Sequence, residues 1–252
     1  MSNSENIYQF GNNAYGKPAT GLNILRETIM GRELFDHAFK VYANRWKFKH
    51  PTPEDFFRTM EDASGVDLDW FFRGWFYSTD FVDIGLEDVK QYYVSETATS
   101  DLKDVKVRKG RFGLDKGPFV YLVSGQNAEL NPKDKKALKI EDVKLLSDYV
   151  DQNLSAEEKA NLKAPNYFYE VTFNKPGGMI MPILVELTYE DDSTESFKYP
   201  AQIWRKNNDT ARKVFATHKA VKKIQIDPKL ETADIDVTNN TWPKQEVKSK
   251  FE

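Results

Sequence analysis

The sequence of 252 residues contains no cysteine, and this absence removes several kinds of site at once. Disulfide bonds, thiolate metal sites and cysteine nucleophiles are excluded, although the redox compartment stays open. Histidine is almost as scarce, with His37, His50 and His218 far apart in the chain. None of them belongs to an H-E-x-x-H pattern, which places two imidazoles one helical turn apart around zinc. We therefore expect no histidine-rich metal site built by this chain alone.

Long apolar runs and an excess of one charge are also missing. No stretch approaches the ~20 apolar residues of a membrane-spanning helix. Lysine and arginine number 36 against 39 aspartates and glutamates, so the formal net charge is −3. This balance gives no reason to expect nucleic acid or an anionic membrane surface as a partner. The sequence indicates no compartment by itself.

Aromatic residues are abundant, at 13% of the chain, and many of them fall at helical spacing before residue 78. The periodicity and end signals predict four helices, of which the first begins at Pro18 and the third at Thr52-Pro53. Gly65 suits the end of the third helix, and Asp67 suits the cap of the fourth. A unit of about 60 residues is small for so many apolar side chains. We therefore expect its aromatic face to pack against a further part of the protein.

From residue 167 onward the hydrophobic period changes from helical to two. Alternating runs at 167–173 and 183–189 are followed by a polar turn at 190–193 and a strand at 194–199, which together suggest a hairpin. Further strands are predicted at residues 203–204, 214–215, 221–226 and 235–237. Short strands at this spacing predict a small antiparallel β-sandwich of immunoglobulin or fibronectin type.

The expected organisation is therefore an α+β multidomain chain. Residues 1–85 are assigned to a helical part, and residues 86–165 to a mixed connecting region whose role is left open. Residues 166–242 are assigned to the β-sandwich, and residues 243–252 to a frayed polar tail.

One tyrosine near the first helix is the main candidate for chemistry. Tyr15 lies in the stretch Asn13-Ala14-Tyr15-Gly16-Lys17-Pro18-Ala19, directly before the helix predicted from Pro18. A phenol held there can donate a hydrogen bond to a developing oxyanion. The alternative is an ordinary turn tyrosine whose hydroxyl makes a local hydrogen bond. Lys17 could position a substrate or Tyr15, although a solvated lysine in the first helical turn is the favoured interpretation.

Two stretches of the chain together resemble the aminopeptidase N-type zinc metallopeptidases, the gluzincin aminopeptidases. Residues 15–22 are similar to the catalytic-tyrosine segment Tyr-x-Lys-Gly-Ala of that family, with Pro18 in place of the glycine. Residues 48–56 and 64–75, which include the pattern Leu-x-x-Phe-Phe-x-x-Trp, are similar to the helical tail of its thermolysin-like catalytic domain. Residues 234–240 are similar to the closing strands of the β-domain in some bacterial members.

The resemblance implies that the chain is the C-terminal portion of a zinc-dependent aminopeptidase, a hydrolase that cleaves the peptide bond at the N-terminus of peptides. Tyr15 would be its oxyanion-stabilising catalytic residue, whereas the zinc ligands and the general base would precede Met1. Zinc and a peptide substrate are then expected in the full-length protein, and the missing N-terminal half of the catalytic domain is the expected partner. The chain alone is expected to bind no metal and to be inactive. The bacterial members favour a periplasmic or other extracytoplasmic location.

Other interpretations stay open. A non-catalytic peptidase-like protein would use the helical face and the sandwich to bind protein or peptide. A complete adaptor would instead have a stable monomeric helical unit with no large exposed apolar face. Four arginines could bind a peptide carboxylate, although surface ion pairs are the favoured role: Arg26, Arg32, Arg45 and Arg73. Four aspartates lack the alternating oxygens and central glycine of a calcium loop, which favours capping and loop roles: Asp67, Asp69, Asp80 and Asp83.

Overall fold

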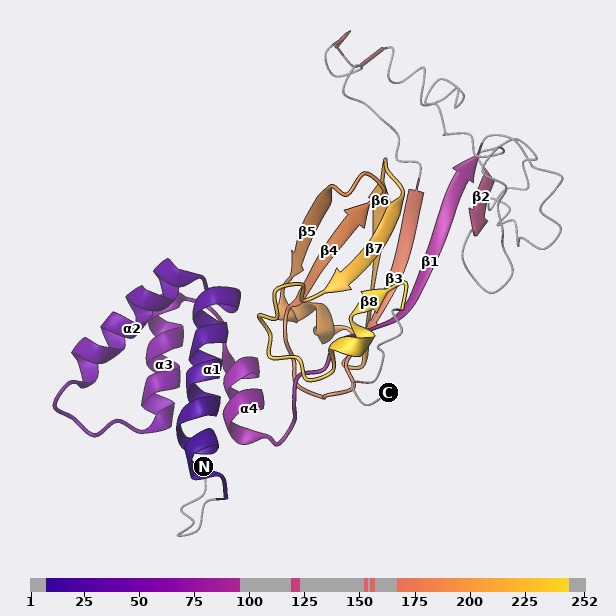
Figure 1. The fold of residues 1–252 in the computed structure, drawn as a ribbon. Helices are drawn as coiled ribbons and strands as arrows, with labels where there is room; N and C mark the ends of the chain where they lie inside the picture. Colours follow the sequence, from indigo (N-terminus) through magenta and orange to yellow (C-terminus); the bar gives the residue numbers. More distant parts are fainter. Residues whose placement is uncertain (1–7, 96–118, 123–151, 154, 157–166, 245–252) are drawn as a thin grey trace.

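The computed structural model describes residues 8–95, 119–122, 152–153, 155–156 and 167–244. A helical unit is followed by two four-stranded antiparallel sheets, so the chain has an α+β fold (Figure 1). Most of the predicted connecting region, residues 86–165, lies outside the described residues. Within the described ranges, no helix combines the length and the apolar character needed to cross a membrane.

The helical unit contains four α-helices and two π-helical turns. The α-helices are α1 (Lys17–Ile24), α2 (Arg32–Trp46), α3 (Pro53–Ser64) and α4 (Asp69–Tyr77). The π-helical turns are η1 (Asn12–Gly16) and η2 (Leu25–Ile29), which flank α1. Together with α1 they make one continuous helical segment from residue 10 to residue 29.

The first helix therefore begins earlier than its predicted start at Pro18, and Tyr15 lies inside the helical segment and not before it. A proline inside an α-helix removes a hydrogen bond to residue i−4, and its ring crowds that carbonyl group. A π-helical turn directly before the proline accommodates this, because its wider hydrogen-bonded ring separates the two groups. Proline at position 18 thus marks the change from η1 to α1.

The ends of α3 follow the local sequence, and this prediction is confirmed. The Thr52 backbone N–H donates to Asp55 Oδ2 at 2.9 Å, which completes a capping box, and Pro53 occupies the first turn. Gly65 closes the helix in the left-handed conformation, with φ of 69°.

The predicted cap of α4 by Asp67 is wrong. The cap position is Leu68, and no side chain caps the helix from that position. The Leu68 backbone N–H instead donates to Glu61 Oε1 at 2.8 Å. The Glu61 carboxylate on α3 therefore satisfies the backbone N–H at the start of α4, and this hydrogen bond joins the two helices.

The first sheet has the strand order β2-β1-β3-β6, and the second has the order β5-β4-β7-β8. The strands are β1 (Gly85–Ser95), β2 (Phe119–Leu122), β3 (Tyr167–Asn174), β4 (Ile183–Tyr189), β5 (Thr194–Tyr199), β6 (Thr210–Thr217), β7 (Val221–Ile226) and β8 (Thr241–Trp242). The alternating runs that predict β3, β4 and β5 are confirmed. The first sheet also includes β1, which lies in the stretch assigned to the connecting region.

The two sheets pack face to face through buried aromatic side chains. The Phe197 and Phe215 rings, on β5 and β6, lie 5.0 Å apart between centroids. Tyr169 on β3 lies against Trp242 on β8 at 6.2 Å, and its hydroxyl accepts a hydrogen bond from the Val221 backbone N–H at 2.8 Å. These contacts put one core between the sheets.

Two predicted strands are short 3₁₀ turns or irregular backbone in the structure. Residues 203–204 fall in η5 (Ala201–Arg205), and residues 235–237 lead into η6 (Val237–Asn239). Trp204 is buried from η5, and its indole N–H donates to the Met181 carbonyl at 2.8 Å. A 3₁₀ turn thus buries the aromatic ring without a strand, so two adjacent apolar residues do not decide the backbone conformation.

The helical unit joins the sheets through several direct contacts. Thr28 Oγ1 donates to the Glu231 carbonyl at 3.3 Å, and Lys198 Nζ donates to the Thr28 carbonyl. A Cβ placed on Gly74 of α4 would lie 3.2 Å from the Met179 side chain. The buried apolar residues of both parts accordingly form one continuous cluster.

Candidate functional site

Tyr15 projects from η1 with an accessible ring. Its side chain is 68% exposed, and its ring meets the Phe10 ring edge-on at 5.9 Å. Among the residues that the structure describes, none forms a hydrogen bond with the Tyr15 hydroxyl. The exposure of the ring and the absence of a partner among the described residues leave the phenol free to donate a hydrogen bond.

Lys17 and Trp75 fix the segment that carries Tyr15. The Trp75 indole N–H donates to the Lys17 carbonyl at 2.8 Å, and Lys17 Nζ lies 5.9 Å from the centre of the indole. Gly21 lies directly against the same ring, since a Cβ there would be 2.5 Å from Trp75 Nε1. The start of α1 is thereby held on α4 by a hydrogen bond, a cation–π contact and close packing.

The three histidines stand on separate elements. His37 is on α2, His50 precedes α3 and His218 follows β6, and all three side chains are exposed. Across the described ranges, one group of acidic side chains has the spacing to hold a metal: Glu61, Asp67 and Asp69.

This acidic triad does not suit zinc. Zinc sites in proteins that include carboxylates combine them with imidazole or thiolate ligands, whereas the triad offers carboxylates alone. Two of the three are already engaged, because Glu61 Oε1 accepts from the Leu68 backbone and Asp67 Oδ2 pairs with Arg205 at 3.1 Å. The described residues therefore do not fit the zinc that the sequence resemblance implies.

A groove between α3 and α4 collects charges of both signs over an aromatic floor. Phe57 and Phe72 stack at 4.3 Å in the floor, and the Tyr77 hydroxyl donates to Glu54 Oε1 at 2.7 Å. This hydrogen bond lowers the pKa of Glu54 and raises the pKa of Tyr77. The full lining is Glu54, Phe57, Arg58, Glu61, Asp69, Phe72, Arg73 and Tyr77.

A second hollow lies between the helical unit and the sheets. The Arg205–Asp67 ion pair crosses it, and both side chains are more than half exposed, so we assign the pair little stability. Its lining includes Asp69, Trp70 and Ile180. Neither hollow is among the sequence predictions. The groove between α3 and α4 could have been predicted from Glu54, Arg58 and Glu61, which alternate in charge along one face of α3.

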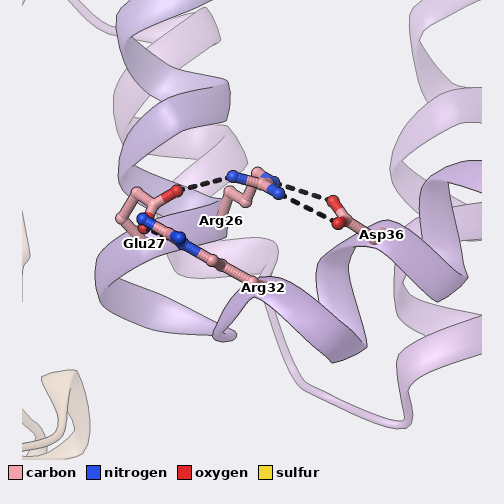
Figure 2. Close-up of polar contacts among 4 residues, drawn as sticks. All are labelled: Arg26, Glu27, Arg32 and Asp36. Atoms are coloured by element: carbon pink, nitrogen blue, oxygen red, sulfur yellow. Dashed lines mark hydrogen bonds and ion pairs between the residues drawn. The ribbon is translucent and has the colours of Figure 1, made fainter.

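Two of the arginines considered for binding a carboxylate are committed to an ion-pair network (Figure 2). Arg26 contacts both carboxylate oxygens of Asp36, at 2.7 and 3.0 Å, and also Glu27 at 2.7 Å. Arg32 Nε contacts the other oxygen of Glu27 at 2.7 Å. The Arg26 guanidinium holds the pKa of Asp36 below its usual value through that hydrogen-bonded pair. The network closes the corner between η2 and α2.

The other two arginines differ from each other. Arg45 Nη1 lies 3.7 Å from Asp62 Oδ2, a loose surface pair. Arg73 lines the groove between α3 and α4, together with Arg58. In the part of the chain that the structure describes, neither Arg58 nor Arg73 forms an ion pair. They are the guanidinium groups of the helical unit that remain available to an anion.

Comparison with known proteins gives limited information. No protein-family model matches the sequence, and no curated protein matches it. Among solved structures, the crystal structure of Legionella pneumophila aminopeptidase A in complex with aspartic acid is similar at 14% sequence identity, with a TM-score of 0.41. The similarity covers 84% of this chain and 16% of that one. The likeness is to a small part of a much longer aminopeptidase chain and assigns no residue a role.

Proposed function

We propose that this chain is the C-terminal portion of a zinc-dependent aminopeptidase, to which it contributes Tyr15 as the oxyanion-stabilising group. The observation that carries the proposal is the exposed phenol of Tyr15, without a hydrogen-bond partner among the described residues, on a helix anchored by Lys17 and Trp75. The helical unit would be the distal part of a thermolysin-like catalytic domain. The two sheets would be an immunoglobulin-like or fibronectin-like sandwich.

The proposal assigns Tyr15 an electrostatic role. When a peptide carbonyl is attacked, negative charge develops on its oxygen, and a preorganised donor stabilises this charge most strongly in the transition state. The phenol hydroxyl is such a donor, and the contact of Lys17 with Trp75 holds its helix in place two residues away. Zinc ligands and the general base belong, in this proposal, to another part of the protein.

The test is Tyr15→Phe in the full-length protein, which removes the hydroxyl and keeps the ring on Phe10. We expect kcat for aminoacyl-anilide hydrolysis to fall by about 10²–10³-fold with little change in KM, because the lost hydrogen bond acts in the transition state. Tyr8→Phe is the matched control, since Tyr8 is also an exposed tyrosine near the N-terminal end of the helical segment, at 84% exposure. An unchanged kcat in Tyr15→Phe would refute the role.

A second candidate function is a non-catalytic peptidase-like protein that binds protein or peptide. It is favoured by exposed aromatic side chains on the helical unit: Tyr8, Phe10, Tyr15, Phe39, Phe48 and Tyr77. The two functions are distinguished by the residues of the full-length protein that precede Tyr15. An intact H-E-x-x-H pattern followed by a glutamate supports the enzyme, and degenerate ligands support the binding protein.

A further inference from the structure

Five polar side chains gather where the helical unit joins the sheets. They come from three segments: Asp83 directly before β1, Asn174 at the end of β3, and Asp234, Asn239 and Asn240 before β8. Asn239 Nδ2 donates to Asp83 Oδ1 at 2.7 Å, and Asn240 Nδ2 donates to Asp234 Oδ2 at 3.1 Å. The two carboxylates therefore each hold one amide by its nitrogen.

The backbone at Gly85 brings two of these amides together. A Cβ placed on Gly85 would lie 2.8 Å from Asn174 Oδ1 and 2.8 Å from Asn239 Cγ. Both amides thus lie against the same glycine from two different segments. Glycine leaves this space open, and any larger residue would displace the two amides.

The amide oxygens of the cluster are buried without a partner. Within the described residues, Asn174 Oδ1, Asn239 Oδ1 and Asn240 Oδ1 accept no hydrogen bond, and the Asn240 residue is only 2% exposed. Folded proteins satisfy nearly all buried acceptors, by protein groups, ordered water or ions. Three orphan oxygens in one cluster therefore indicate an additional group that supplies positive charge or donors.

The charges of the cluster favour a cation as that group. Asp83 is 8% exposed, and neither Asp83 nor Asp234 forms an ion pair with a lysine or arginine in the described part of the chain. Asp234 accepts hydrogen bonds from the backbone N–H groups of Ile84, at 3.3 Å, and Asp236, at 3.0 Å, but these donors carry no full positive charge. Two neighbouring carboxylates without a cationic side chain repel each other, and a bound cation supplies the opposite charge.

We propose that Asp83, Asp234 and the amide oxygens of Asn174, Asn239 and Asn240 bind a calcium ion. Calcium accepts six to eight oxygen ligands from carboxylates and from asparagine or backbone carbonyl groups, and it tolerates irregular geometry. The set holds oxygen donors alone, and its two carboxylates balance a divalent charge. The Asn239 and Asn240 amide nitrogens can keep their hydrogen bonds to the carboxylates while the oxygens of the same amides bind the ion.

The exposed triad of Glu61, Asp67 and Asp69 is the competing location for a divalent cation in this chain. Glu61 is engaged with the Leu68 backbone and Asp67 with Arg205, and none of the triad's oxygens is a buried acceptor without a partner. The experiment therefore has to separate the two clusters.

The experiment measures calcium binding to the chelator-treated 252-residue chain, by calorimetry and by thermal unfolding. We expect about one calcium per chain and a Tm increase of about 5 °C or more at a hundredfold excess over Kd, with a smaller effect of magnesium. Asp83→Asn should abolish both signals, because it keeps an oxygen for Asn239 and removes one charge. Asp236→Asn is the control in the same segment, since the Asp236 carboxylate accepts hydrogen bonds from Thr238, and only the unchanged Asp236 backbone N–H contacts the cluster.

Two results would overturn the proposal. One is a wild-type chain that shows neither binding heat nor a Tm shift with calcium, which would leave buried water as the partner of the amide oxygens. The other is calcium binding that disappears in the double variant Asp67→Asn/Asp69→Asn. That double variant and the wild-type chain decide the question even if Asp83→Asn does not fold. Neither readout depends on peptidase activity, so the result is separate from the proposed function.

Discussion

At the scale of single residues, Tyr169 is a polar group on which the packing of the two sheets depends. Its side chain is fully buried, and its hydroxyl accepts hydrogen bonds from the Val221 backbone N–H at 2.8 Å and from Gln91 Nε2 at 3.2 Å. One phenol oxygen therefore satisfies donors from β7 and from β1. Removal of this oxygen leaves the buried Val221 N–H without its acceptor.

We expect Tyr169→Phe to lower the free energy of unfolding by about 1–3 kcal/mol, because the Val221 N–H loses its acceptor while the ring packing is kept. Chemical denaturation of both chains measures the difference. Tyr199→Phe is the control: Tyr199 is half-buried in the same core, and its hydroxyl forms no hydrogen bond with any described residue. A loss of equal size in both variants would contradict the assignment.

The same residue gives a pH dependence with a defined sign. Burial raises the pKa of Tyr169 to about 12 from its usual value near 10. The folded chain thus holds the phenol proton more tightly than the unfolded chain does, so this contribution is complete below pH 10 and is lost as the pH rises toward 12. The stability difference between the wild-type chain and Tyr169→Phe should narrow over that interval.

At the scale of elements, the close packing of α1 on α4 requires a glycine at position 21, where a side chain would collide with Trp75. Gly21→Ala should favour the helix by about 1 kcal/mol through intrinsic propensity. Its Cβ would lie 2.5 Å from Trp75 Nε1 and 2.8 Å from Trp75 Cδ1, so the helices must separate. We expect net destabilisation of about 1–3 kcal/mol and loss of the Trp75–Lys17 hydrogen bond, measured by thermal unfolding and tryptophan fluorescence.

Gly16→Ala is the matched control for that prediction. Gly16 has helical backbone angles, and a Cβ there would meet no atom within 4 Å. The variant should therefore gain stability, by about 0.5–1 kcal/mol. If Gly21→Ala and Gly16→Ala shift the Tm in the same direction by similar amounts, the close packing of α1 on α4 does not control the stability of the unit.

The elements also show which structural features are readable from local sequence. The ends of α3 follow from Thr52-Pro53 and Gly65, and the β7 bounds follow from the run 221–226, because caps and period-two runs act over a few residues. The π-helical turn under Tyr15 and the 3₁₀ turn at Trp204 were not predicted. The 3₁₀ turn depends on the fit of the Trp204 ring against Met181, which is distant in the sequence. The π-helical turn depends on Pro18, and it forms because the helix begins before the start that the local signals indicate.

The candidate sites also differ in whether a local sequence pattern indicates them. Tyr15 could be identified from sequence because its neighbours along the chain form the pattern. The contact of Asp83 with Asn239 could not, since 156 positions separate the two residues. No local pattern specifies that these segments meet, and the unpartnered amide oxygens become visible only after the sheets are assembled.

At the scale of the whole molecule, the helical unit and the sheets should unfold together. Their apolar residues form one cluster, and Thr28, Lys198 and Glu231 link them by hydrogen bonds. We expect coincident thermal transitions by far-ultraviolet circular dichroism, which follows the helices, and near-ultraviolet circular dichroism, which follows the aromatic core. Two transitions separated by more than about 5 °C would contradict this, because the parts would then have independent stabilities.

The segment from Asp227 to Trp242 has a consequence for the order of assembly during synthesis. It contacts the helical unit through Glu231 and the second sheet through β8. The Ile235 backbone N–H also donates to the Val82 carbonyl, in the segment between α4 and β1. The ribosome makes this segment after all the other helices and strands described. The nascent chain can therefore form its helices and most of its sheets early. The contacts of the segment 227–242 with the helical unit and the second sheet form only after that segment has been synthesised.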